Sequence, residues 1–155
     1  MEIVIAQDDH IPEIVDLWIE FSVYHESLNH PWYPLKAEAP SGFEVYLRKE
    51  MSSEKSRVIV ALDKDRVVGY AIAMINKMTA VWVRERYGCI DQLAITASYR
   101  HQGIGSYLLK NILNWFRSEN LDLIELSIAA KNSVGYSFWK KHGFEDSSHT
   151  LYLKP

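Results

Sequence analysis

The sequence has a single cysteine, Cys89, so it can form neither an internal disulfide nor a cysteine-based zinc site. It also has no excess of basic residues: 17 Lys and Arg against 20 Asp and Glu leave a net charge of −3, which gives no support to nucleic-acid binding. The most apolar run, residues 67–75, is far shorter than the roughly 20 residues that a membrane helix needs. The first nine residues lack the basic start and the apolar run of a signal peptide. We therefore expect a cytoplasmic protein that binds neither nucleic acid nor a membrane.

The sequence likewise lacks internal repeats, low-complexity tracts and domain linkers. No pair among its six histidines has metal-ligand spacing on one expected helix, so we expect no metal site. These histidines are His10, His25, His30, His101, His142 and His149. With 48% hydrophobic and 24% charged residues, the 155-residue chain is expected to fold as one domain, residues 1–155.

The spacing of apolar residues predicts strands and helices along the whole chain. Strands are expected at residues 2–7, 57–62, 67–75, 87–95, 123–129 and 144–153, and helices after Asp9, Ser41, Gly105 and Asn132. The strands at 57–62 and 67–75 should form a hairpin. Those at 87–95 and 123–129 are joined through a helix and should therefore be parallel. Gly69 predicts a bulge or a close backbone approach, and Gly143 a left-handed helix cap.

Residues 29–40 contain three prolines and are expected to form a loop. Its aromatic residues, Trp32 and Tyr33, either line a pocket or anchor the loop on the core.

A glycine-bearing turn, Arg100 to Gly105, stands between the strand that ends near Ile95 and the next helix. The first N–H groups of a helix have no internal partner, and the helix dipole adds partial positive charge there. Such a place binds phosphate. Gly103 and Gly105 have no Cβ to block an anion, and Arg100 brings a permanent cation to the rim.

Three known phosphate-binding designs place glycines at a helix start as this turn does. A P-loop needs a lysine directly after its second glycine, where this chain has Ser106. A Rossmann turn needs a third glycine, where this chain has Leu108. The third design, R/Q-x-x-G-x-G/A, is satisfied by Arg100, Gly103 and Gly105. With it, the stretch resembles the acyl-CoA pyrophosphate loop of the GNAT family of N-acetyltransferases.

A second motif strengthens the resemblance. In the family the last helix tends to read N-x-x-A-x-x-F/L-Y-x-x-x-G-F, and this chain has matching or related residues at Asn132, Gly135, Phe138, Trp139, Gly143 and Phe144. The order of elements also matches, so the resemblance covers nearly the whole chain. It implies an α/β GNAT fold: a mixed, mostly antiparallel sheet with a central, splayed parallel strand pair, flanked by helices. The surroundings of the turn are similar to the polyamine acetyltransferase branch.

The resemblance also implies the binding site for acetyl-CoA. The parallel strands should splay beyond Leu93, so that the backbone of Leu93, Ala94 and Ile95 contacts the pantetheine arm. The pyrophosphate would be wrapped by Arg100, His101, Gln102, Gly103, Ile104, Gly105 and Ser106. Asn132 and Trp139, on the last helix, would lie near the thioester.

An attacking amine must first lose a proton, because a free alkylammonium has a pKa near 10.4. Asp91 is the candidate base: it lies two residues before Leu93, expected on the same side of the strand, and the polyamine branch has an acidic residue there. The alternative is a solvated strand carboxylate. Glu85 is a weaker candidate, and Cys89 has no paired histidine that would make it a nucleophile.

The family usually has a tyrosine as general acid seven residues after the asparagine, where this chain has Trp139. Either no acid is needed, because a thiol pKa near 8.5 makes thiolate a tolerable leaving group, or Tyr136 replaces it. Asn132, Tyr136 and Trp139 are spaced to share one helix face. The alternative for Tyr136 is a packed or half-exposed aromatic residue.

These observations predict an acetyl-CoA-dependent N-acetyltransferase that acts on a primary amine of a small acceptor, and a homodimer is possible by analogy. The alternative is a non-catalytic acyl-CoA-binding sensor or scaffold. Family acceptor pockets are built from the first two helices, where acidic residues outnumber basic ones and favour a cationic acceptor, unless they only face water. The acidic residues are Glu20, Glu26, Glu38 and Glu44.

Overall fold

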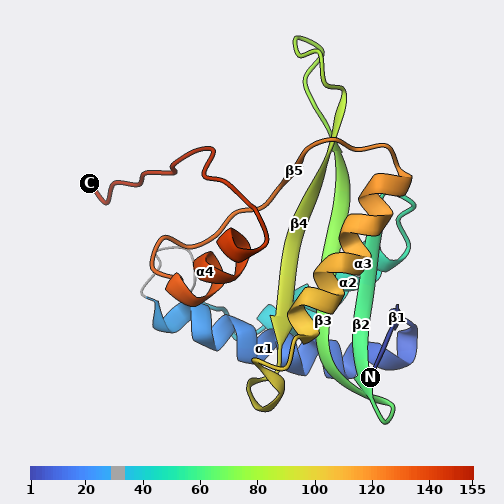
Figure 1. Ribbon diagram of the computed structural model, residues 1–155. Coiled ribbons are helices and arrows are strands. Elements are labelled where there is room, and N and C mark those ends of the chain that lie inside the picture. The colour runs from blue at the N-terminus through green and yellow to red at the C-terminus, as the bar shows by residue number, and fades with distance from the viewer. Residues whose placement is uncertain (29–33) are drawn as a thin grey trace.

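One mixed sheet of five strands, in the order β1-β2-β3-β4-β5, organises the protein in a computed structural model that describes residues 1–28 and 34–155 (Figure 1). The strands are β1 (Glu2–Ile5), β2 (Ser56–Asp63), β3 (Arg66–Lys77), β4 (Arg86–Ile95) and β5 (Ile124–Glu125). The first four pair antiparallel, and β4 pairs with β5 in parallel. The predicted α/β fold with a parallel strand pair is confirmed.

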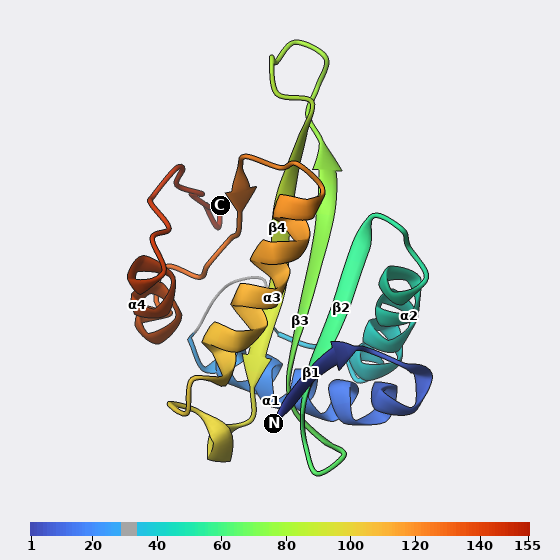
Figure 2. The same ribbon diagram turned by 45° about the vertical axis from the view of Figure 1, so that its right-hand side comes forward.

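Helices cover both faces of the sheet (Figure 2). They are α1 (Ile11–Ser27), α2 (Ala39–Met51), α3 (Ile104–Ser118) and α4 (Ser133–Lys141), with short 3-10 turns η1 (Asp8–His10) and η2 (Ala97–Tyr99). α1 and α2 pack on one face and α3 on the other, while α4 lies beside the β5 edge. No helix in the described ranges is long and apolar enough to cross a membrane.

Alternation along the central strands divides the core in two. In β3, Tyr70 and Ile72 pack toward α1 and α2, whereas Ala71 and Ala73 pack toward α3. All four side chains are fully buried. The expected hairpin of β2 and β3 is confirmed, and so is the role of Gly69: a Cβ there would lie 2.6 Å from the Ile95 side chain, beside a register shift in the hairpin.

The expected ends of several elements are wrong. α3 begins at Ile104 rather than after Gly105, and α2 at Ala39 rather than after a Ser41 cap, with Pro40 in its first turn. The expected strand at 123–129 is reduced to Ile124–Glu125. Residues 144–155 form no strand, because the neighbouring edge strand offers only two residues to pair with. The prediction for residues 29–33, with Trp32 and Tyr33, lies outside the described residues.

Candidate active site

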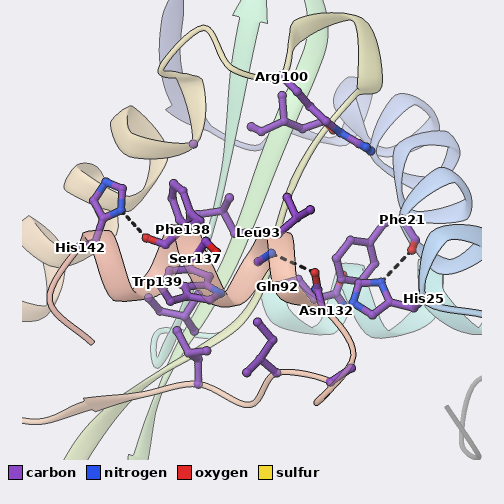
Figure 3. A pocket seen from close by; sticks show the side chains of 18 of the residues that line it. Phe21, His25, Gln92, Leu93, Arg100, Asn132, Ser137, Phe138, Trp139 and His142 are labelled. Carbon is purple, nitrogen blue, oxygen red and sulfur yellow. Dashed lines mark hydrogen bonds between the residues drawn. The ribbon is translucent and has the colours of Figure 1, made fainter. Parts of the chain in front are cut away.

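A pocket of about 1050 Å³ opens where β4 and β5 separate. Its wall combines β4, the turn that leads into α3, residues 126–129, α1 and α4 (Figure 3). The two strands pair only at Gly88 with Ile124 and Cys89 with Glu125. The splay expected beyond Leu93 therefore begins four residues earlier, directly after Cys89.

The backbone of β4 turns two N–H groups toward this open edge. Thr96 N–H donates to Val68 of β3 at 3.0 Å, and N–H directions alternate along a strand. The N–H groups of Leu93 and Ile95 therefore point away from β3, into the gap. Arg100 Nε donates to the Ile95 carbonyl oxygen at 3.0 Å on the same side. An extended ligand can add to this edge as a strand does.

Because of a β-bulge in β4, the Asp91 side chain points to a different side of the sheet from the one predicted from the sequence. Ile72 pairs with Gln92 and Ala73 with Ile90, which leaves Asp91 as the extra residue in β4. The bulge reverses the alternation: Leu93 packs with the α3 core, whereas Asp91 accepts a hydrogen bond from Tyr46 of α2 at 2.7 Å. The expectation that Asp91 and Leu93 share one side of the strand is therefore wrong.

The surroundings of Asp91 raise the pKa of its carboxyl group. Burial raises its pKa above the ordinary value, and the Glu50 carboxylate adds to the rise, although hydrogen bonds from Tyr46 and Gln92 oppose it. A raised pKa is typical of carboxyl groups that act as acids or bases. Burial, with the Asp91 charge, also raises the pKa of Cys89 to about 11, so this thiol stays protonated at neutral pH.

The turn presents a row of open backbone donors. Within the described chain, none of the N–H groups from His101 to Ser106 donates to a protein acceptor. His101 and Gly103 have positive φ angles of 63° and 84°, and left-handed residues of this kind occur in the backbone turns that bind anions. A Cβ on Gly105 would lie 3.3 Å from Phe138, so this glycine serves close packing of α3 on α4 as well.

The Arg100 side chain lies against α1 rather than over the turn (Figure 3). Its Nη2 donates to Glu20 at 3.1 Å. Glu20 also accepts from the Thr96 hydroxyl at 2.9 Å and from the Ala97 N–H at 2.8 Å. One carboxylate of α1 thus holds both the end of β4 and the arginine of the glycine turn.

Asn132 caps α4 at the far end of the pocket. Its Oδ1 accepts from the Gly135 N–H at 2.9 Å and from the Tyr24 hydroxyl of α1 at 3.2 Å. A Cβ at residue 135 would lie 2.8 Å from Asn132 Nδ2, which explains glycine at the motif's alanine position. Trp139 also lines the pocket, packed edge-on against Phe138 and Phe144. The left-handed cap expected at Gly143 is confirmed by its φ of 87°.

Some expected site residues lie outside the pocket wall. Ala94 is buried in the α1 and α2 core, and the Gln102 side chain donates back to Ser98. Tyr136 donates to Asp146 at 3.0 Å, away from the pocket. Glu85 lies beyond the splay, near α3's C-terminal end, so it is not near Asp91.

The pocket also contains residues that the sequence did not single out. Phe21, Ser22 and His25 of α1 face it, and His142 approaches it from the end of α4. The amphipathic stripe of α1 indicated only a core helix, because a stripe does not distinguish core from pocket. None of the four acidic residues expected near the acceptor lines the wall; across residues 1–28 and 34–155 its single carboxylate is Asp91.

Comparison with known proteins agrees with this geometry. A model of the acetyltransferase (GNAT) family matches residues 14–144. The chain belongs to the GNAT family. Two curated relatives are N-alpha-acetyltransferase 30 of Schizosaccharomyces pombe, 33% identical over 55% of each chain, and an uncharacterized N-acetyltransferase of Archaeoglobus fulgidus, 25% identical over 90% of this chain and 89% of the other. The match therefore spans about half the length of the Schizosaccharomyces protein.

Solved structures share the fold. A mutant of the BH1408 protein from Bacillus halodurans has a TM-score of 0.86 at 19% identity, over 100% of this chain and 99% of the other. Aminoglycoside N-acetyltransferase AAC(6')-Iy in complex with CoA has a TM-score of 0.76 at 11% identity, over 99% and 98%. At these identities the likeness concerns the fold.

Proposed function

We propose that this protein transfers the acetyl group of acetyl-CoA to a primary amine of a small, cationic acceptor. The observation that carries the proposal is the continuity of one pocket, whose wall includes Asp91 as well as Arg100, His101 and residues 103–106 of the glycine turn. A thioester held from the turn along β4 would meet an amine held at Asp91. AAC(6')-Iy, which has this fold, is itself described in complex with CoA.

The residues present fit acetyl-CoA as a substrate. The N–H groups from His101 to Ser106 would bind the pyrophosphate, with Gly103 giving the backbone its turn. The open edge at Leu93 and Ile95 would hydrogen-bond the pantetheine arm, as an added strand would. Asn132 and Trp139, at the α4 side of the gap, would border the thioester. Arg100 would act mainly through the shape of the turn, since Glu20 holds its guanidinium.

The chemistry needs a proton acceptor near the amine. In the proposed step the amine nitrogen attacks the thioester carbonyl, the C–N bond forms and the C–S bond breaks. Asp91 takes the proton of the amine, directly or through water, and the thiolate leaves with the bond's electron pair. A thiol pKa near 8.5 allows this departure without a dedicated acid, which agrees with Trp139 in place of the family's tyrosine.

The part of the pocket that includes Asp91 favours an acceptor that carries its amine on a partly apolar molecule. Trp18 and Phe21 of α1 line the same pocket as Asp91. An alkylammonium is attracted both by a carboxylate and by aromatic faces. The support for a cationic acceptor therefore comes from Asp91 and these rings rather than from the acidic residues of the surrounding helices.

Transfer assays with a panel of amines test the proposal. Purified protein would be given acetyl-CoA with polyamines, amino sugars, amino acids or peptide N-termini, and thiol release and acetylated product would be measured. We expect amine-dependent thiol release with at least one small cationic acceptor. Assays without acceptor correct for hydrolysis and for reaction of the thiol reagent with Cys89. Binding of CoA without transfer to any amine would instead support the non-catalytic sensor.

A further inference from the structure

A serine and a histidine form a contact at the phosphate end of the pocket that the transfer chemistry does not use. Ser106 Oγ lies 3.0 Å from His142 Nε2, and both residues line the pocket. Ser106 belongs to the first turn of α3, whereas His142 directly follows α4. The contact thus joins the two motif-bearing elements beside the open N–H groups of the turn.

The hydrogen bonds of His142 determine which ring nitrogen carries a hydrogen and where the Ser106 hydroxyl hydrogen points. His142 Nδ1 lies 2.8 Å from the Phe138 carbonyl oxygen, which can only accept, so Nδ1 carries a hydrogen. In the neutral ring Nε2 is then an acceptor, and it must receive the Ser106 hydroxyl hydrogen. In this state neither group has a donor left for an anion.

A proton on His142 Nε2 reverses the direction of the hydrogen bond between Ser106 and His142. The protonated ring donates to Ser106 Oγ, which releases the serine hydroxyl hydrogen toward the pocket. An anion at the turn would gain one hydroxyl donor and one nearby positive charge. We propose that His142 is a cofactor-binding residue that takes up a proton when the diphosphate of CoA binds, with Ser106 as the donor that it releases.

The charges around His142 support linkage to an anion. Lys141, the residue before His142, lines the same pocket, and the N-terminus of α3 adds partial positive charge beside Ser106. The nearby carboxylates do not face the ring: Asp146 is occupied by Lys140 and Tyr136, and Glu145 is exposed. The Phe138 ring lies beside the imidazole, tilted by 44°, with 4.4 Å between the ring centroids. The negative charge of a bound diphosphate would therefore favour the protonated form of His142.

Calorimetric titration with dephospho-CoA tests the proposal, which rests on the proposed cofactor. This probe keeps the diphosphate but lacks the terminal phosphate monoester, whose own pKa near 6 would add a second proton. Titrations at one pH in two buffers of different ionisation enthalpy give the protons taken up. We expect net uptake at pH 7, and affinity that falls by about tenfold from pH 6 to pH 8, within the limit of one linked proton.

Matched variants test whether His142 is the residue that takes up the proton. His142→Gln keeps hydrogen-bonding ability but cannot take a charge, so uptake should vanish and affinity should become nearly independent of pH. His101→Asn, in the same turn, and His149→Asn, outside the pocket, should keep the uptake. The imidazole nitrogen signals of His142 in the wild-type protein should also shift toward the protonated form on binding, a readout that needs no variant.

Uptake that persists in His142→Gln, or that disappears in His101→Asn instead, would overturn the assignment. Binding by the wild type with no proton uptake would overturn it as well. A wild-type protein that binds neither CoA nor dephospho-CoA would overturn the proposed function itself, so the two failures are distinguishable.

Discussion

The two ends of the pocket are built in different ways. At the end of the pocket formed by the glycine turn, the backbone N–H groups of residues 101–106 have no hydrogen-bond acceptor in the described part of the chain, and all of these residues except Gln102 line the pocket. At the acceptor end, side chains from separate elements converge: Phe21 from α1, Asp91 from a bulge in β4, and Tyr46 of α2 behind Asp91. A backbone site depends on local φ and ψ angles, whereas a side-chain site depends on how distant elements pack.

This difference explains why only one end of the pocket could be recognised from a sequence motif. Local backbone geometry requires glycine at a defined spacing, so the turn could be found as a motif. The acceptor wall requires no particular spacing along the chain, and its composition is that of an ordinary amphipathic helix. Substitutions at the two ends should accordingly separate cofactor affinity from turnover.

The largest effect is expected from Asp91→Asn. Loss of the base should lower turnover by roughly 10²–10⁴ with little change in CoA affinity. In the wild type, activity should be lost as pH falls through the Asp91 pKa, which burial raises above its ordinary value. Asp91→Asn should remove this acidic limb from the pH–rate profile. Glu85→Gln, outside the pocket, is the matched control, and an unchanged profile in Asp91→Asn would assign Asp91 a structural role.

At the other end, Gly103→Val should weaken CoA binding by about 100-fold while leaving the fold largely intact, because valine resists the left-handed backbone that the turn needs. No atom lies within 4 Å of a Cβ there, so a steric clash with protein is not the cause. Gly103→Asn is the control, since asparagine tolerates positive φ. Equal binding by the valine and asparagine variants, measured by calorimetry, would contradict the role of backbone conformation.

Loss of the ion pair between Glu20 and Arg100 should have a smaller effect than either of these substitutions. Glu20→Gln removes the charge that holds Arg100, and we expect the KM for acetyl-CoA to rise by about fivefold, typical of a partly exposed ion pair with added hydrogen bonds. Glu44→Gln breaks an ion pair that lies within α2 and should leave this KM unchanged. A loss of turnover without a change in KM would place Glu20 at the chemistry instead.

Tyr46→Phe should shift the pH profile rather than abolish activity. The Tyr46 hydroxyl stabilises the Asp91 carboxylate and so opposes the rise of its pKa. Without it the pKa should rise further, which moves the acidic limb of kcat/KM to higher pH and leaves the alkaline rate nearly unchanged. Tyr87→Phe, which removes a hydroxyl that contacts Asn76 outside the pocket wall, is the control. A shift toward lower pH would contradict this arrangement.

The smallest effect is expected from Tyr136→Phe. Its hydroxyl donates to Asp146 outside the pocket wall, so turnover should fall by less than tenfold, below the usual span of acid–base catalysis. A loss of a hundredfold or more with CoA affinity retained would show that Tyr136 supplies the proton to the leaving thiolate.

Much of the fold followed from the sequence because local patterns determine it. The apolar stripe of α3, the hairpin at Gly69 and the cap at Gly143 were predicted from spacing and residue type. Boundaries that depend on a partner were not: β5 is two residues long because the chain leaves β4 after Glu125, and residues 144–155 then have almost no edge to pair with. Period-two alternation indicates that a segment can be a strand, but hydrogen-bonding partners decide whether it becomes one.

The sequence by itself determined the glycine turn before α3, since Gly103 must adopt a positive φ and the first turn of any helix leaves its N–H groups open. Only the tertiary structure decided the side to which Asp91 points. A single extra residue in β4 reverses the alternation and places this carboxylate against Tyr46 of α2. The same holds for Glu20 with Arg100 and for Ser106 with His142, which are 80 and 36 residues apart. No local rule brings such pairs together, because their contact depends on how whole helices pack against the sheet.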